Sequence, residues 1–379
     1  MTQTALQGKA LLVSFELSKQ KWWLTLGLDV KARRQVEVEA GDFKRVTREL
    51  RHTKRKLGLP EGAGVVSCYE AGRDGFWIHR QLLALGVENL VVDSASIEVS
   101  RRQRRAKSDR LDGAALLRLL ARYQAGERDV WRVVRVPPAE AEEARREGRE
   151  LGRLQQERTG HCARLRSLLA QHGLQCGTLH GLRARLSGLR EWDGRPLGAH
   201  VVGELQRECA RLELVEAQIR ELEGRRKAEV QAARAAGAQA PQALRKVVVL
   251  KQLRGIDASA WTLIQEFFGW REFSNGKEVG GLAGLTGTPY ASGASSRDQG
   301  ISKAGNWRVR AVMVELAWSW LRYQPHSRLS RWFEERYGRG AKRNRRVGIV
   351  ALARRLLVAL WKYVERGELP EGAVLKASA

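Results

Sequence analysis

The first part of the chain, up to about residue 130, alternates between short apolar runs and helical patterns. Short runs rich in Val, Leu, Trp and Tyr are typical of strands, and apolar residues that recur every three or four positions are typical of helices. The predicted strands cover residues 10–17, 21–30, 33–41, 63–70 and 88–93, and the predicted helices cover 42–56, 73–85 and a segment opened by Ser108. This order indicates an α/β domain over residues 1–130, with a mixed sheet and helices packed on it.

A different pattern follows Pro137 and Pro138, which interrupt the periodicity. Between residues 138 and 235, apolar residues return every seven positions, as in coiled coils. One stripe consists of Leu205, Leu212, Val215, Ile219 and Leu222, and a second stripe, expected on an antiparallel helix, consists of Leu151, Leu154, Leu165 and Leu168. We therefore expect a helical hairpin or coiled coil, which packs helices or joins subunits rather than performing chemistry.

The remaining chain is expected to form a mainly α-helical domain over residues 245–370. Residues 232–242 are rich in Ala, Gly and Gln and are predicted to be a linker. Around Gly255, two helices joined by a tight turn are expected, and the turn is either a phosphate-binding corner or a plain helical corner. Residues 307–366 read as helix, with Arg and Lys placed among Trp and Leu.

Charge narrows the range of functions. The chain has 68 Lys and Arg against 42 Asp and Glu, a net charge of +26. Self-repulsion of this size is easiest to understand if the protein meets a polyanion, so nucleic acid is the leading partner. The four cysteines form no C-x-x-C pair and no zinc spacing with the seven histidines, and no apolar run approaches membrane-spanning length. A reduced, cytoplasmic setting without a membrane fits these observations.

Four acidic residues are candidates for a site at the carboxyl edge of the predicted sheet. Glu16 and Glu70 each end an apolar run, and because an unpaired carboxylate is costly to bury, both are expected at the carboxyl edge of the sheet. Asp109 and Asp112 share one helix face. Ser108 or Asp109 can instead cap that helix, which is a common role for such residues. Four converging carboxylates would repel unless cations joined them, and such ligands suit one or two Mg²⁺ ions, with Mn²⁺ as a substitute.

The order of these motifs resembles a known family. The family's first block usually shows a start like G-I-D-V-S-K and corresponds to "SFELSK" at residues 14–19. Its second block corresponds to "YEAGRDGFWIHRQL" at 69–82, and its third to "AKSDRLDGAAL" at 106–116. Its transposase domain corresponds to residues 253–318. The chain thus resembles the RuvC-like (RNase H-like) nucleases and, more closely, the DEDD transposases of the insertion-sequence family numbered one-ten. The resemblance implies a RuvC-like α/β domain, a coiled-coil segment and a helical transposase domain.

The resemblance also implies a catalytic set. Its metal-binding acids fall on Glu16, Glu70, Asp109 and Asp112, and its nucleophilic serine falls on Ser292. Glu16 departs from the more common Asp, which makes the side chain longer.

Three residues compete for these roles, and four cations are expected to assist. Asp29, in the neighbouring strand, is an alternative to Glu16, and Ser295 and Ser296 are rivals of Ser292 in a segment where hydroxyls are ordinary turn residues. The cations expected to hold the nucleic acid are Arg297, Lys303, Arg308 and Arg310, although a solvated helix face explains them too.

The resulting hypothesis is a DNA transposase or recombinase of a prokaryotic insertion sequence, associated with the nucleoid. It would bind element ends and target DNA, cut a strand through a phosphoserine link, and rejoin it under the guidance of a structured bridge RNA. A homo-oligomer, a dimer or a tetramer, is expected because strand exchange needs two cut strands held together. Two alternatives remain, a metal-only RuvC-like junction endonuclease and a non-catalytic protein that bridges nucleic acids.

Overall fold

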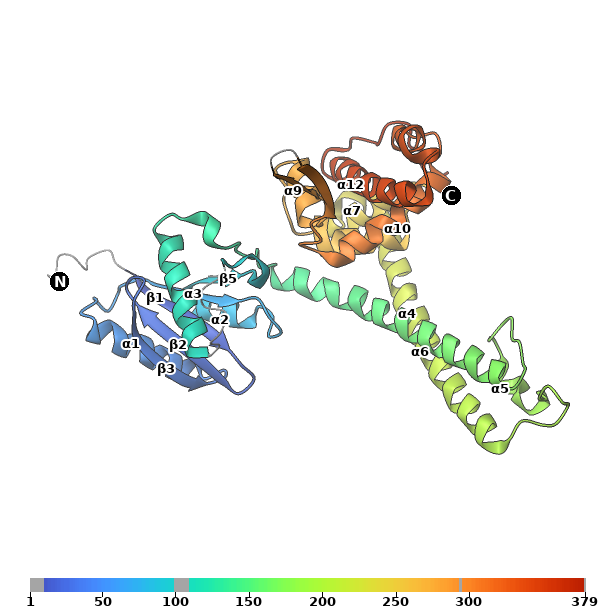
Figure 1. Cartoon of the computed structure of the whole chain (residues 1–379), viewed down its shortest axis with the longest axis horizontal. Coiled ribbons are helices and arrows are strands. Elements are labelled where there is room, and N and C mark those ends of the chain that lie inside the picture. The colour runs from blue at the N-terminus through green and yellow to red at the C-terminus, as the bar shows by residue number, and fades with distance from the viewer. Residues whose placement is uncertain (1–9, 99–108, 293–294, 378–379) are drawn as a thin grey trace. The chain divides into compact units, whose positions relative to one another are not determined.

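The computed structural model describes residues 10–98, 109–292 and 295–377, and gives only the backbone for Asp109 and for residues 289–292 and 295–299. The chain divides into two compact units, residues 1–136 and 137–379 (Figure 1). The elements of the first unit are β1 (Leu11–Leu17), β2 (Lys21–Gly27), β3 (Ala32–Glu39), α1 (Phe43–Lys56), β4 (Val65–Glu70), α2 (Trp77–Ala84), β5 (Glu88–Val92), η2 (Ser94–Ser96), α3 (Asp109–Gln124) and η4 (Arg128–Val130).

The first unit is built on a five-stranded mixed sheet in the order β3-β2-β1-β4-β5. β1, β2 and β3 pair antiparallel, whereas β1, β4 and β5 pair parallel. The prediction of a mixed sheet with helices is therefore confirmed. The helix predicted from residue 42 begins at Phe43, because the Asp42 side chain accepts a hydrogen bond from the Arg45 amide at 2.8 Å and caps it.

Alternation along β1 sends successive side chains to opposite faces of the sheet. Leu11, Val13 and Phe15 pack in one apolar cluster with residues of α1 and α2. Leu12 packs on the other face, in a cluster with Cys68 and with Leu116, Leu117 and Leu120 of α3. The sheet thus lies between α1 and α2 on one side and α3 on the other, and even-numbered residues of β1 face α3.

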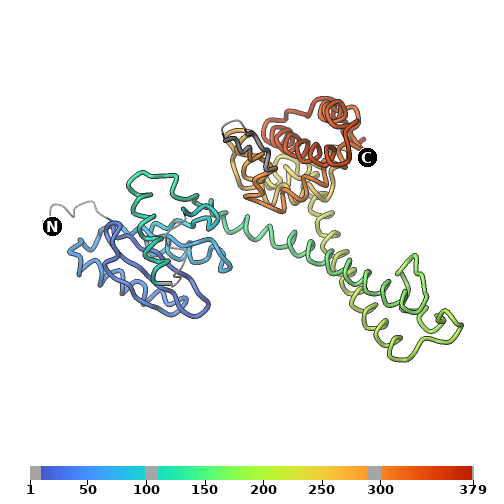
Figure 2. Tube along the Cα trace, in the orientation of Figure 1, coloured from blue at the N-terminus to red at the C-terminus, as the bar shows by residue number. Residues whose placement is uncertain are grey.

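The second unit begins with two long antiparallel helices. The elements are α4 (Ala139–Gln171), α5 (Leu182–Arg185), η5 (Leu186–Gly188), α6 (Ala199–Ala236), η6 (Gly237–Gln239), α7 (Gln242–Lys251), α8 (Ala258–Leu263), η7 (Ile264–Phe268), α9 (Gly276–Leu282), β6 (Gly287–Ser292), β7 (Ser295–Ile301), α10 (Trp307–Tyr323), α11 (Arg328–Phe333), η8 (Glu334–Gly338) and α12 (Lys342–Arg366). Figure 2 shows α4 running beside α6 in opposite direction, with the short elements of residues 172–198 at one end.

The predicted helix stripes meet across this pair. Leu151 and Leu154 pack with Val215, Ile219 and Leu222, and Leu165 packs with Leu205 and Leu212. Leu169, rather than the predicted Leu168, is fully buried in the seam. The linker predicted at residues 232–242 is wrong for its first half, because α6 continues to Ala236 and ends only at Gly237.

The C-terminal elements enclose the largest apolar core of the described chain. Trp320, Phe267, Phe268 and Phe333 are fully buried in it. The Gly255 turn has the expected left-handed conformation, with φ of +85°. Its carbonyl accepts a hydrogen bond from Ser319 Oγ at 3.0 Å, and an added Cβ would meet Tyr323 at 2.9 Å, so the turn packs as a helical corner against α10. Across the described residues, every helix is too short or too polar to span a membrane.

Candidate active site

Two of the predicted acids share one cavity. Glu16 lies near the end of β1 and Glu70 ends β4, its parallel neighbour. Both line a cavity of about 480 Å³ at the carboxyl edge of the sheet, together with Lys19, Arg73 and Asp74. We call this space the acid cavity. Strand alternation places both glutamates on the face covered by α3, two residues beyond the buried Ser14 and Cys68.

The helix α3 is pressed onto this face at one point. Ser14 Oγ donates a hydrogen bond of 2.6 Å to the Gly113 carbonyl. An added Cβ on Gly113 would lie only 2.6 Å from Thr25 Oγ1, so only glycine permits this approach. Leu12, nearer the amino end of β1, packs in the same cluster as Leu120. The first turn of α3 therefore points toward the carboxyl edge where Glu16 lies.

That first turn carries the other two predicted acids. Asp112 is partly buried and directly precedes Gly113, and Asp109 begins the helix. The Asp109 side chain lies outside the described residues. Among the described side chains, no three His, Cys, Asp or Glu residues lie close enough together to hold one metal ion. The structure thus joins Glu16 and Glu70 in one cavity and brings the α3 turn to their face of the sheet.

The alternative prediction, that Asp29 takes the place of Glu16 in the metal site, is wrong. β2 runs antiparallel to β1, so Gly27 at its end pairs with Leu12, whereas Glu16 pairs with Trp23. Asp29 therefore lies beyond the opposite edge of the sheet, where it accepts a hydrogen bond from the Lys31 amide at 2.8 Å. That hydrogen bond lowers the pKa of Asp29. Its role is to close the turn between β2 and β3.

The serine lies on a β-hairpin that was not expected. Residues 287–301 were predicted to lie in a helical domain with a polar loop, but β6 and β7 pair antiparallel there. Ser292 is the last residue of β6 and pairs with Ser295, while Ser296 pairs with Ala291. Their side chains lie outside the described residues. The prediction of a loop around Ser292 is therefore corrected to a strand end, and we call residues 287–301 the serine hairpin.

Similarity to known proteins decides the family. The pattern that defines the IS116/IS110/IS902 family of transposases matches residues 248–330, which include the serine hairpin. The candidate transposase y4rJ of Sinorhizobium fredii is 42% identical to the chain over 376 residues, covering 97% of the chain and 95% of y4rJ. The chain belongs to the IS110/IS116/IS902 transposase family. The family assignment makes this transposase a DNA-processing enzyme of an insertion sequence.

A second relative points the same way. The candidate transposase y4qE of Sinorhizobium fredii is 30% identical over 303 residues, which cover 76% of this transposase and 65% of y4qE. Together with y4rJ, it extends the similarity well beyond residues 248–330.

The predicted nucleic-acid-binding cations of this transposase occupy four different settings. Lys303 is exposed and has a φ of 55°, a conformation that a residue with a side chain rarely adopts. The Arg308 guanidinium lies 4.5 Å from the Trp307 ring centre, and burial, with the charge of Arg149, lowers its pKa. Arg310 donates a hydrogen bond of 3.2 Å to the Ala283 carbonyl and so fastens α10 to the end of α9. The Arg297 side chain lies outside the described residues.

Sequence reasoning missed a partly buried ion pair beside α10. Arg149 of α4 donates two hydrogen bonds to Glu266, of 2.7 and 2.9 Å. Asn306 caps α10 by accepting from the Arg308 amide at 3.0 Å, and its amide donates to the Glu266 carbonyl at 3.3 Å. Burial would raise the pKa of Glu266, but the hydrogen bonds and charge of Arg149 lower it overall. This pair fixes the long helices to the segment that follows the serine hairpin.

Trp23 is a second residue without a sequence signal. It pairs with Glu16 across β1 and β2, and its Cδ1 would lie 3.5 Å from an added Cβ on Gly113. Its indole Nε1 is buried and donates to no group in the described structure. The adjacent Trp22 packs in the apolar core on the other face of the sheet, and nothing in the sequence distinguishes the two tryptophans.

Proposed function

We propose that this transposase cuts and rejoins DNA by attack of Ser292 on a phosphodiester, assisted by divalent ions held by a RuvC-like first unit. One observation carries the proposal: Glu16 and Glu70 line one cavity on the sheet face that receives the first turn of α3. The strand order also supports it, since an antiparallel three-strand segment followed by two parallel strands puts the acids of β1 and β4 side by side.

The acid cavity has the donors that Mg²⁺ or Mn²⁺ requires. Carboxylate oxygens are the preferred ligands of these hard ions, and Glu16, Glu70, Asp109 and Asp112 would supply them. Such ions, if held by these carboxylates, would stabilise the negative charge that develops on a phosphate under attack. The longer Glu16 side chain lies near a strand end rather than within the core, which leaves it room to reach inward.

Ser292 would act as the nucleophile. Its Oγ forms a bond to phosphorus while losing its proton, and the departing oxygen of the DNA strand takes up a proton. The product is a phosphoserine link that conserves the energy of the phosphodiester for rejoining. The strand-end position of Ser292 at the tip of the hairpin is compatible with this role, because the major groove of DNA admits a two-stranded β-ribbon.

The chain is also proposed to work as a homo-oligomer guided by RNA. Ser292 and the acids belong to different compact units, so the serine of one subunit can serve the acids of another. The α4–α6 pair supplies a long surface for joining subunits. A structured bridge RNA, pairing with donor and target DNA, would provide sequence specificity, and the net charge of +26 supports a second polyanion beside DNA.

Amide variants of the acids test the proposal. Glu70→Gln and Asp112→Asn should each abolish Mg²⁺-dependent cleavage of a plasmid carrying the element ends, assayed with the RNA that copurifies with the protein. Asp74→Asn is the matched control, because Asp74 lines the same cavity but pairs with Arg73 at 3.3 Å. It should keep near-normal activity. Equal loss in all three variants, or cleavage that survives both Glu70→Gln and Asp112→Asn, would refute the metal site.

A further inference from the structure

The second unit contains a large open cavity that the proposed chemistry does not use. It has a volume of about 1480 Å³ and is bordered by α9, the serine hairpin, α11, η8 and α12. Small-molecule sites usually measure about 300–1,000 Å³. The cavity therefore suits a segment of a polymer better than a free metabolite. We call it the basic cavity.

Seven cations surround the basic cavity. They are Lys277, Lys303, Arg336, Arg343, Arg346, Arg354 and Arg355. None of the described lining residues is acidic, and none of the seven has an ion pair within the described structure. Seven like charges around one space repel one another, so an anionic occupant would stabilise the arrangement. Arginine is well suited to phosphate because its guanidinium can donate two parallel hydrogen bonds.

Part of the wall is held in place by close helix packing. An added Cβ on Gly276 would lie 2.9 Å from Val358, and one on Gly280 would lie 3.0 Å from Arg354 Nε. These two glycines are four residues apart on α9, so they form one face that lies directly against α12. The Arg354 side chain is therefore positioned before any ligand arrives, which reduces the entropy lost on binding.

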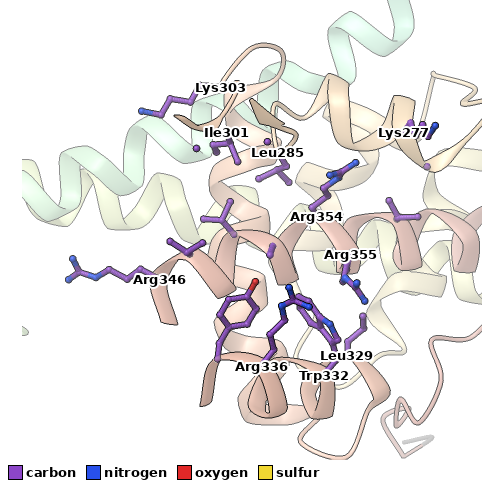
Figure 3. Close-up of a pocket in the computed structure, with 18 of the residues that line it drawn as sticks. Lys277, Leu285, Ile301, Lys303, Leu329, Trp332, Arg336, Arg346, Arg354 and Arg355 are labelled. Carbon is purple, nitrogen blue, oxygen red and sulfur yellow. The ribbon is translucent and has the colours of Figure 1, made fainter. Parts of the chain in front are cut away.

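The basic cavity also offers an aromatic surface. Trp332 and Tyr337 meet edge to face, with ring centres 5.7 Å apart, and the Arg355 guanidinium lies 4.0 Å from the Trp332 ring centre. Figure 3 shows Trp332, Arg336 and Arg355 gathered at one end of the cavity, while Lys303 and Arg346 extend from another side. Cations beside aromatic rings are the combination that binds single-stranded nucleic acids, through phosphates and stacked bases.

The serine hairpin identifies the strand. Gly287, Gly300 and Ile301, at the base of the hairpin, line the basic cavity, whereas Ser292 lies at its tip. Ser292 lies five positions after Gly287 on β6, a span of roughly 17 Å at about 3.3 Å per residue. A DNA strand that presents a phosphate to Ser292 and follows the hairpin thus reaches the basic cavity a few nucleotides away.

We infer that the basic cavity holds an unpaired nucleotide of the DNA strand that Ser292 cuts, with its base against Trp332 and Tyr337 and its phosphates on Arg354 and Arg355. The inference rests on the proposed function for the identity of the strand. A base inside the cavity cannot be paired, so the DNA must be opened beside the cut. The cavity would then hold the strand open while it is exchanged.

Photo-crosslinking tests the inference without any cleavage step. The probe is a 12-nucleotide single-stranded thymidine DNA with one 4-thiothymidine, irradiated with full-length Ser292→Ala protein and mapped by mass spectrometry. Adducts are expected at Trp332 or Tyr337. They should fall about fivefold or more in a variant with Arg354→Gln and Arg355→Gln, and stay unchanged in the control pair Arg331→Gln and Arg339→Gln, which are exposed and outside the cavity.

Two binding measurements complete the test. The slope of log affinity against log salt should decrease by about 1.4 in the Arg354→Gln, Arg355→Gln variant, roughly 0.7 for each lost phosphate contact. An abasic version of the same DNA should bind wild-type protein about 5- to 150-fold more weakly, since one stacked base is lost. Because neither assay needs Ser292, failure of the serine mechanism would leave these results standing.

Three outcomes would overturn the inference. The first is crosslinks that avoid Trp332 and Tyr337, or that survive the Arg354→Gln, Arg355→Gln variant. The second is equal affinity for the abasic and the intact DNA. The third is preferential crosslinking of a 4-thiouridine RNA of the same length to Trp332 or Tyr337, which would make the occupant RNA.

Discussion

Replacing Gly113 with alanine tests how closely α3 is pressed against the sheet that carries the acids. In the wild-type protein, the added Cβ would lie 2.6 Å from Thr25 Oγ1, far inside contact distance, while Trp23 Cδ1 and Thr25 Cβ would remain at 3.5 and 3.6 Å. The conflict therefore involves a single oxygen atom. Thr25→Ala removes that oxygen, together with the Cγ2 methyl and the hydrogen bond of 3.3 Å that Gln35 Nε2 donates to Oγ1, and so should remove the conflict.

The magnitude follows from two opposing effects. Alanine stabilises a helix interior by about 1 kcal/mol relative to glycine. Overpacking a buried contact costs about 1–3 kcal/mol. In the wild-type background, Gly113→Ala should therefore destabilise the first unit by about 1 kcal/mol. In the Thr25→Ala background, the same change should stabilise it by about 1 kcal/mol, so the sign reverses.

Native-state hydrogen exchange of peptides from α3 and β2 measures these changes within the first unit alone. Gly224→Ala on α6 is the matched control, because its added Cβ would meet no atom within 4 Å, and it should only stabilise its own helix. Cleavage activity should fall with Gly113→Ala and recover partly in the double variant, since α3 carries Asp112. If Gly113→Ala stabilised α3 in both backgrounds, the account of the α3 contact would be wrong.

Two further predictions concern assembly and pH. Mixing inactive Ser292→Ala and Asp109→Ala proteins should restore part of the cleavage activity, because mixed oligomers pair an intact serine with intact acids. Mixtures that stay inactive although both variants assemble would place the site within one chain. Burial would raise the pKa of Glu208, but hydrogen bonds with His161, Arg164 and Arg211 bring it to about 2. The stability that the ionised Glu208 gives to the α4–α6 pair is thus present above pH 4.5 and lost as pH falls toward 2. Glu208→Gln should flatten the dependence of unfolding on pH over that range, as followed by circular dichroism. An unchanged pH dependence would contradict the role of Glu208.

Much of the first unit could be predicted from sequence because its signals are local. Short apolar runs at residues 10–17 and 63–70 predicted β1 and β4, and the acid at the end of each run pointed to Glu16 and Glu70 before any contact was known. The seven-residue repeat likewise predicted the α4–α6 pair. In each case, the pattern that predicts the element lies in consecutive residues and does not depend on the segment that packs against it.

The missed features depend on partners far along the chain. Residues 287–301 are rich in Gly, Ser and Ala and lack apolar alternation, so the pairing of β6 with β7 leaves no periodic trace. Arg149 and Glu266 are 117 residues apart, and either could have been an ordinary surface charge. The linker prediction failed because Ala-rich sequence continues a helix as readily as it ends one, and only Gly237 stops α6.

Mapping the covalent link between protein and DNA tests the central claim most directly. Protein, Mg²⁺, the copurifying RNA and a DNA carrying the element end are stopped in mid-reaction, digested with nuclease and protease, and examined by mass spectrometry. The account predicts a nucleotide attached to Ser292, absent in Ser292→Ala and retained in Ser295→Ala and Ser296→Ala. Cut DNA with no attached protein would favour attack by water at the acid cavity, and a nucleotide on Ser295 or Ser296 would give the nucleophile's role to a different residue.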